Sequence, residues 1–274
     1  MLILLPPSET KADGGTGAAL DLDALSFPTL NPVRSEILDD LSSLDEDTAL
    51  QVLGISEALR GEAAANRELH TAATMPALER YTGVLYDALD AVSLTDEDAH
   101  ARSRLAVGSA LFGVVRADDL IPHYRLSSGT KLPVQDAGRG AGSAVLTAVP
   151  TLKKRWGRLI TEALQSTPDG SGDGVIVDLR SGGYQGLGKV PSAVTVRVES
   201  VRPDGSRKVV SHFNKHYKGV LARVLATAGA DADAARTAAD IAAIAAAAGM
   251  TVEINESKDA AGGKAPKDTL TLVV

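Results

Sequence analysis

Four charged residues interrupt an otherwise apolar stretch in the middle of the chain. Residues 108–132 read GSALFGVVRADDLIPHYRLSSGTKL, and the charges are Arg116, Asp118, Asp119 and Arg125. Burying a charged side chain without a partner is costly, because the protein interior cannot replace the water that solvates it. These side chains therefore either pair with one another or line a cleft open to an anionic ligand. Both alternatives constrain how the surrounding segments fold.

Acidic and basic residues are segregated along the chain. Residues 1–100 hold 5 Lys and Arg against 19 Asp and Glu, whereas residues 101–274 hold 23 against 16. The formal net charge of −7 is thus the balance of −14 and +7. This asymmetry predicts an acidic face and a basic face, and the basic face is the candidate surface for phosphate groups. A fold that mixes the two halves in space would instead give a more uniform electrostatic potential over the surface.

The absence of cysteine and of long apolar segments excludes several classes of protein. The 274 residues include no cysteine, which excludes disulfides, thiolate metal sites and a cysteine nucleophile and is typical of a reducing compartment. No basic region precedes the short apolar run at the N-terminus, and Arg236 and Asp240 interrupt the alanine-rich segment 234–250. We therefore expect a cytoplasmic protein without a signal peptide or a membrane partner.

Short apolar runs, helical periodicities and turns alternate along the chain and predict a mixed α and β fold. The expected strands are 1–5, 175–179, 193–201 and 208–213, the expected helices include segments of 31–69 together with 152–164 and the segment from 214, and the expected hairpin arms are 251–254 and 269–273. The sequence thus predicts a single α+β domain over residues 1–274. It has a helical N-terminal third, a mixed sheet and a C-terminal hairpin.

The segment VLGISEALRGEAAANREL, within about residues 47–70, has the pattern of a helix-hairpin-helix element. Two short helices flank a turn at Gly54, and such a turn can present backbone N–H groups to a phosphate, which needs glycine for close approach. A glycine between two amphipathic helices is also a common connector, and Glu57 and Glu62 would repel DNA locally. Both interpretations stay open.

Polar residues follow the predicted strands, where α/β proteins place their chemistry. Ser8, Thr10 and Lys11 form the turn after the first strand. Asp178 ends an apolar strand and is either a paired core acid or a site residue. The cleft candidates are Ser8, Thr10, Lys11, Tyr81, Tyr124, Ser181 and Tyr184.

A second group of polar residues lies around the start of the helix expected from residue 214. Asn214, Lys215, His216, Lys218 and Arg223 cluster there, and a lysine at a helix start opposes the helix dipole. A residue placed against its local preference often serves a site. Lys215 is therefore the strongest single candidate for contact with a ligand.

Six blocks of sequence occur in a fixed order along the chain: MLILLPPSET, YTGVLYDAL, SALFGVVRADDLIPHYRL, LKKRWGRLITEAL, VIVDLRSGGY and SHFNKHYKGVLARVL. Together they resemble the YaaA peroxide-stress protein family across nearly the whole chain. The resemblance implies a single mixed α/β protein of unusual fold with a positively charged cleft and a helix-hairpin-helix element. It also implies binding to DNA under hydrogen peroxide stress, where the protein limits damage linked to intracellular iron.

The resemblance also indicates individual positions within these blocks. They are Pro7, Thr10, Tyr81, Gly83, Gly113, Arg116, Asp119, Tyr124, Arg125, Trp156, Gly157, Ser181, Tyr184, Lys215, Gly219 and Arg223. Two positions depart from the family pattern. Many members carry lysine before the threonine of the first turn, where this chain has Glu9 and places its lysine at Lys11, and His123 separates Pro122 from Tyr124. Glu9 lowers the positive charge of the expected cleft.

The first functional hypothesis is DNA binding with little base specificity. Its phosphate contacts are Arg116, Arg125, Lys215, Lys218, Arg223 and Gly54. Fixed charges on phosphates give an affinity that depends steeply on salt. Because aromatic residues are only 3% of the chain, contact with a duplex backbone is favoured over stacking on single strands.

The second hypothesis is an enzyme that acts on a nucleotide, nucleoside or damaged base in the same cleft. Asp178 or Asp119 would serve as the base and Lys215 as the electrostatic or nucleophilic residue. Neither common glycine loop for nucleotides occurs, so we expect no cofactor. A third hypothesis, direct iron binding, lacks support because the five histidines form no pattern of two histidines and a carboxylate, and we expect no metal.

Overall fold

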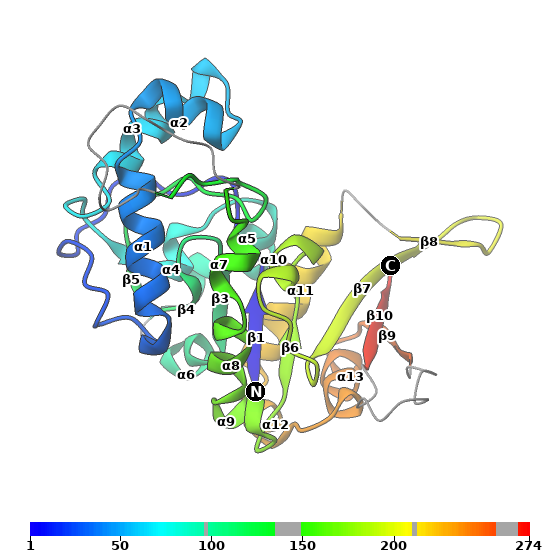
Figure 1. The fold of residues 1–274 in the computed structure, drawn as a ribbon. Helices are drawn as coiled ribbons and strands as arrows, with labels where there is room; N and C mark the ends of the chain where they lie inside the picture. Colours follow the sequence, from blue (N-terminus) through cyan, green and yellow to red (C-terminus); the bar gives the residue numbers. More distant parts are fainter. Residues whose placement is uncertain (96–97, 135–148, 210–212, 256–267) are drawn as a thin grey trace.

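A largely parallel sheet forms the centre of the molecule. The computed structural model describes residues 1–95, 98–134, 149–209, 213–255 and 268–274. In spatial order the strands are β4 (Gly113–Arg116), β3 (Leu105–Ser109), β1 (Leu2–Leu5), β6 (Ile176–Asp178), β7 (Val194–Val201), β10 (Thr269–Val273) and β9 (Thr251–Asn255), with β8 (Arg207–Val209) paired to β7 (Figure 1). The strands β3, β1, β6, β7 and β10 are mutually parallel, so their carboxyl ends meet at one edge.

The central strands β1, β3 and β6 are buried along their whole length. Their unbroken apolar runs fit this position, because parallel strands covered on both faces need no polar alternation. Two short strands, β2 (Met75–Pro76) and β5 (Leu120–Ile121), pair separately. The hairpin of β7 and β8 projects away from the body of the molecule (Figure 1).

Helices surround the sheet, and the acidic N-terminal third is predominantly helical as expected. They are α1 (Asn31–Ser42), α2 (Glu46–Leu53), α3 (Arg60–Arg67), α4 (Ala77–Arg80), α5 (Val84–Leu89), α6 (Ala99–Ser103), α7 (Leu152–Trp156), α8 (Leu159–Gln165), α9 (Pro168–Ser171), α10 (Gly182–Leu187), α11 (Asn214–Thr227), α12 (Ala230–Ala234) and α13 (Ala238–Ala247), with 3-10 turns at Pro28–Leu30, Glu57–Leu59 and Ala91–Ser93. The mixed α and β fold class is confirmed.

Close packing of α5 against α11 positions one wall of the site. Gly219 lies at this crossing, and a Cβ there would come within 2.2 Å of the Leu85 carbonyl oxygen. The apolar face of α11 includes Leu221 and Leu225, which are buried in the core. Any side chain at position 219 would therefore push the start of α11 away from α5.

Three expected elements differ in the structure. The helix expected over 152–164 is broken into α7 and α8 at Gly157, whose φ of 53° lies in the left-handed region that favours glycine. The strand expected over 208–213 is β8 up to Val209, while Phe213 caps α11 and residues 210–212 lie outside the described residues. The C-terminal hairpin forms from β9 and β10, but β10 also pairs in parallel with β7 and so joins the central sheet.

No described helix combines the length and the apolar character that crossing a membrane requires. The hairpin loop at 256–267 lies outside the described residues.

Candidate functional site

Two adjoining cavities, which together we call the cleft, lie at the carboxyl edge of the parallel strands. Their volumes are about 590 and 260 Å³, and both are lined by Pro6, Pro7, Glu9, Leu85 and Lys215. The crevice outside the carboxyl ends of parallel strands is the usual ligand site of an open α/β sheet. The turn after β1 and the start of α11 thus form the wall that the two cavities share.

The turn after β1 is held in place by the residues that lead into α5. Ser8 Oγ accepts a hydrogen bond from the Thr82 backbone N–H (3.2 Å), and Thr82 Oγ1 donates to Thr10 Oγ1 (3.2 Å). Lys11 forms an isolated β-bridge with Tyr81. Gly83 precedes α5 with a φ of 93°, which a residue with a side chain rarely adopts. These bonds hold Ser8 and Thr10 in the lining of the cleft, whereas Lys11 lies next to it and lines neither cavity.

The first turn of α11 contributes two lysines with different surroundings. The Lys215 side chain is exposed and has no partner among the described residues. Lys218 is buried, and its Nζ donates to the Leu179 carbonyl oxygen (3.1 Å). Burial lowers the pKa of Lys218, and the nearby charge of Asp178 opposes that shift. Lys215 is the lysine available to a ligand.

A buried ion pair supports the floor of the larger cavity. Asp178 at the end of β6 accepts from Arg180 Nε and Nη2, both at 2.9 Å, and from the Arg180 backbone N–H. Nη2 also donates to the Gly188 carbonyl oxygen (2.9 Å). Gly108 makes room for this arginine, because a Cβ there would meet Arg180 Cδ at 2.6 Å. Both carboxylate oxygens of Asp178 thus already accept hydrogen bonds from Arg180.

A chain of buried hydroxyls lies behind the cleft wall. Ser109 Oγ, at the end of β3, is 2.8 Å from the Tyr124 hydroxyl, which is 2.7 Å from the Tyr81 hydroxyl. Burial raises the pKa of both tyrosines, so they remain protonated O–H groups. Lys11 Nζ lies over the Tyr124 ring, 4.3 Å from its centroid. Lys11, Tyr81 and Tyr124 therefore form one cluster.

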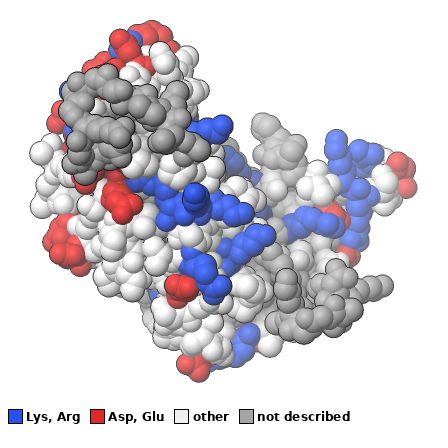
Figure 2. Space-filling view, in the orientation of Figure 1, with Lys and Arg blue, Asp and Glu red and all other residues white. Residues whose placement is uncertain are grey.

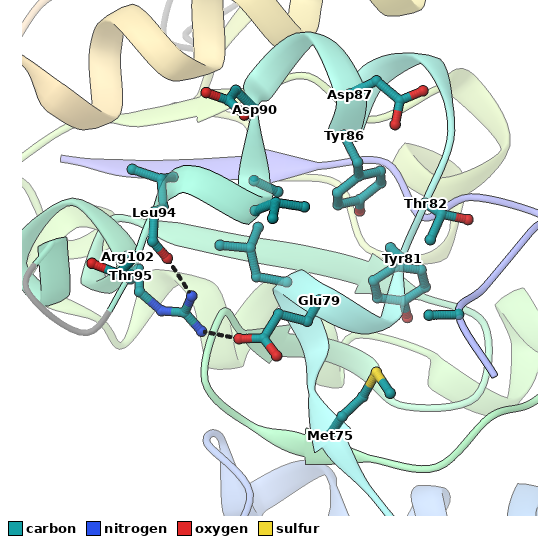
Figure 3. Close-up of a pocket in the computed structure, with 14 residues that line it drawn as sticks. Met75, Glu79, Tyr81, Thr82, Tyr86, Asp87, Asp90, Leu94, Thr95 and Arg102 are labelled. Atoms are coloured by element: carbon teal, nitrogen blue, oxygen red, sulfur yellow. Dashed lines mark hydrogen bonds and ion pairs between the residues drawn. The ribbon is translucent and has the colours of Figure 1, made fainter. Parts of the chain in front are cut away.

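A further cavity of about 770 Å³ lies beside Tyr81 and Tyr86 (Figure 3). Its charged lining residues are Glu79, Asp87, Asp90 and Arg102, and Figure 3 shows Arg102 turned to Glu79 and to the Leu94 carbonyl oxygen. Three acids against one paired arginine give this cavity a negative lining, which repels phosphate. The charge of its lining therefore distinguishes this cavity from the cleft, where Lys215 is exposed.

Comparison with known proteins agrees with the sequence blocks. The family model described as "Peroxide stress protein YaaA" matches residues 1–246. The chain belongs to this YaaA family. A UPF0246 protein of Corynebacterium efficiens is 61% identical over the full length of both chains. A UPF0246 protein of Streptomyces coelicolor is 47% identical over 238 residues, 84% of each chain.

The YaaA-family block around Arg116 and Asp119 lies away from the cleft. Arg116 pairs opposite Ala106, near the amino end of β3, and its Nη1 donates to the Ser103 carbonyl oxygen (2.8 Å). Asp119 accepts from the Arg116 backbone N–H and from Ser26 N–H and Oγ at 2.8 to 3.0 Å. Neither residue lines the two cavities of the cleft. The structure separates them from Lys215.

The other predicted residues lie at different distances from the cleft. Arg125 pairs with Glu9 (2.8 Å), which lines the cleft, whereas Arg223 donates to the Asp90 carbonyl oxygen (3.1 Å) further along α11. Gly54 ends α2 and lines a separate cavity. The cleft lining also includes Ser8, Thr10, Ser181, Tyr184 and Lys218.

Sequence reasoning missed two residues of this cleft. Arg180 and Arg197 line the larger cavity and were not among the candidates. Asn214, which belongs to the polar group expected at the start of this helix, lines the cavity too, and its Oδ1 is buried without a described hydrogen-bond partner. The spacing of Asp178 and Arg180 carried a usable signal, because residues i and i+2 of an extended chain lie on one face. Among the described residues, no group of His, Asp and Glu side chains is arranged to hold a metal ion.

Proposed function

We propose that this chain is a stress-response protein that binds duplex DNA at the cleft, through phosphate contacts with little base specificity. The observation that carries the proposal is Lys215, whose exposed ammonium has no described partner at the point where both cavities meet. An uncompensated cation of this kind is the group that displaces counterions from a phosphate backbone.

The distribution of charge on this face supports the proposal. Figure 2 shows Lys and Arg gathered in a band that crosses the face from the body of the molecule toward the β7–β8 hairpin. On that hairpin Arg207 pairs with Glu253, whereas Arg202 and Lys208 are exposed and have no described partner. A duplex lying across the cleft would meet these two cations as well as Lys215.

The pair α2 and α3 is the second contact in this proposal. Gly54 ends α2 with a φ of 64° and is exposed, as a helix-hairpin-helix turn requires. Arg60, at the start of α3, is paired with Glu46, Asp47 and Glu57. The hairpin would therefore contribute backbone N–H groups rather than free positive charge.

The test is the affinity of Lys215→Met for a labelled duplex, measured by fluorescence anisotropy across a range of salt concentrations. We expect near-native melting and binding weaker by roughly 1 to 3 kcal/mol, the range for losing a charge-assisted contact. The slope of log affinity against log salt should decrease by about one. Arg158→Met is the matched control, because it removes an exposed charge that pairs with Glu162 outside the cleft.

Two results would contradict the proposal. One is an affinity that does not change with salt, which rules out phosphate-dominated contact. The other is a Lys215→Met protein that melts earlier and binds normally, which would assign the lysine to the stability of α11. Equal losses in Lys215→Met and Arg158→Met would show only a net-charge effect and would also overturn the site.

The enzyme hypothesis receives support from one feature of the structure, the cluster at Lys11. Asp178 and Asp119, its expected bases, both accept hydrogen bonds from the protein itself. Lys11 has unfilled hydrogen-bonding capacity next to Ser8 of the cleft lining, and a lysine there offers a different chemistry from phosphate binding.

A further inference from the structure

Lys11 is a largely buried amine that lies over two tyrosine rings and forms no salt bridge with a described residue. Its Nζ lies 4.3 Å from the ring centroid of Tyr124 and 5.5 Å from that of Tyr81. One hydrogen bond to protein is present, to the Ser8 carbonyl oxygen at 3.1 Å. An ammonium has three N–H donors, so two remain without a described acceptor.

The carboxylates near Lys11 already interact with other side chains. Glu9 pairs with Arg125 (2.8 Å), and Glu62 accepts from His123 Nε2 (2.9 Å). Burial lowers the pKa of Lys11 to about 8, although the charges of Glu9 and Glu62 oppose the shift. About a tenth of the amine is then neutral at pH 7, far more than for an ordinary lysine.

The N-terminal amine shows how the same protein stabilises a buried cation. Met1 is buried, and its ammonium is held by Asp169 at 2.7 Å. Lys11 has no comparable carboxylate within salt-bridge distance among the described residues, so burial increases the fraction of the neutral, nucleophilic amine. Lysines activated by desolvation in this way attack carbonyl carbons.

We propose that Lys11 is a nucleophile that forms an imine with the aldehyde of a ring-opened abasic sugar in DNA bound at the cleft. This inference rests on the proposed function. Loss of a base leaves a deoxyribose whose open form carries an aldehyde, and the flanking phosphates would occupy the cleft beside Lys215. Ser8 lines the smaller cavity while its carbonyl holds Lys11 Nζ, so the amine lies directly behind that cavity wall.

The size of the smaller cavity agrees with this substrate class. Its volume of about 260 Å³ lies just below the roughly 300 to 1,000 Å³ of sites for drug-sized ligands. It therefore suits a single sugar unit better than a base pair. Glu9 lines this cavity and pairs with Arg125, and both charges act on Lys11, so a phosphate that drew Arg125 away from Glu9 would change the surroundings of the amine.

The reaction balances without an oxidant, a reductant or a metal. The Nζ lone pair attacks the aldehyde carbon, the carbonyl electron pair moves to oxygen, and a proton transfers from nitrogen to that oxygen to give a carbinolamine. Loss of water then forms the C=N bond. The rings against Nζ carry the hydroxyls of Tyr81 and Tyr124, which form a chain with Ser109 and stay protonated. Their raised pKa values make them weak acids, so they assist the departing hydroxyl by hydrogen bonding, and the proton it takes comes from the carbinolamine nitrogen by way of solvent.

Reductive trapping tests the proposal. The protein is incubated at pH 7 with a duplex that carries one abasic site and with sodium cyanoborohydride, which reduces the imine to a stable secondary amine. We expect a covalent protein–DNA adduct that peptide mapping places on Lys11. Lys11→Arg keeps the positive charge and cannot form the imine, so its adduct yield should fall at least about tenfold. Lys154→Arg is the matched control and should retain the adduct, because this exposed lysine of α7 lines neither cavity of the cleft.

Two further measurements separate the possible failures. Anisotropy with an intact duplex reports DNA binding by itself, and reductive methylation with formaldehyde reports the reactivity of Lys11 by itself. We expect Lys11 to be methylated at pH 7 before the exposed Lys215. An adduct mapped to Lys215 or Met1, or no adduct although the duplex binds, overturns the proposal.

Slower methylation of Lys11 than of Lys215 overturns it as well, because the amine is then not activated. If Lys11 is reactive but no duplex binds, the proposed function fails and abasic DNA is excluded as the substrate. Peptide mapping of the wild-type protein identifies the reacting residue directly, so the test does not depend on whether Lys11→Arg folds.

Discussion

Charged residues occur at both edges of the parallel strands, and their surroundings differ. At the amino edge, Asp119 accepts three hydrogen bonds from Arg116 and Ser26, and the Arg116 guanidinium donates to a backbone carbonyl. At the carboxyl edge, Lys215 of the cleft has no described partner, and Lys11 next to the cleft donates to a single described carbonyl oxygen. The density of charge in the sequence therefore does not locate a site. Compared with the amino edge, the cleft includes a cation without a described partner, whose interaction with a ligand is not offset by the loss of an existing ion pair.

The largest expected effect tests a paired charge that lies at the cleft itself. Asp178→Asn leaves the buried Arg180 without its carboxylate, and we expect the free energy of unfolding to fall by about 3 kcal/mol. Denaturant unfolding measures the change, and DNA binding by the folded fraction should remain. Normal stability together with lost reductive trapping would instead make Asp178 a functional residue.

Asp119→Ala tests the amino edge. It deprives the Ser26 and Arg116 N–H groups and the Ser26 hydroxyl of their acceptor, so we expect a loss of about 2 kcal/mol in stability. Glu162→Ala is the control, because both partners of its ion pair with Arg158 are exposed and such pairs contribute roughly 0 to 1 kcal/mol. If the free energy of DNA binding changed more than the free energy of unfolding, Asp119 at the amino edge would have to take part in DNA binding.

Lys11→Met should increase stability near neutral pH. The folded-state pKa of about 8 lies below the unfolded value of 10.5, so the unfolded chain binds more protons between these values. The wild-type protein should therefore gain stability as pH rises from 8 to 10.5, while the variant lacks this gain. We expect the variant to be more stable by roughly 1 to 2 kcal/mol at pH 7 and the difference to shrink by pH 10.5. Parallel unfolding curves at all pH values would contradict an uncompensated Lys11.

Glu9→Gln should give the smallest effect. It removes the negative charge that pairs with Arg125 and lines both cavities, so duplex binding should tighten by about 0.5 kcal/mol at low salt. Anisotropy titrations at two salt concentrations measure this, and the gain should diminish at the higher one. Weaker binding would show that Glu9 holds Arg125 in the orientation that DNA requires.

Much of the local structure could be predicted from the sequence. The apolar run at residues 1–5 is the buried strand β1, the periodicity after Asn31 is α1, and the arms of the C-terminal hairpin pair as expected. The helix break at Gly157 was not predicted, because apolar periodicity continues through it and only the left-handed φ requires the glycine. The parallel pairing of β10 with β7 also escaped prediction, since it joins segments far apart in the chain.

The sequence by itself determined the family, the mixed fold class and the residue types from which a phosphate site is built. It identified Lys215 because a cation at a helix start opposes a local preference, which is a property of neighbours in the chain. Only the tertiary structure decided which charges were compensated. Arg180 reaches Asp178 and Arg125 reaches Glu9 through the packing of separate segments, while Lys11 is left against two tyrosine rings contributed by distant parts of the chain. Desolvation and pairing depend on distances in space, so linear spacing could not assign them.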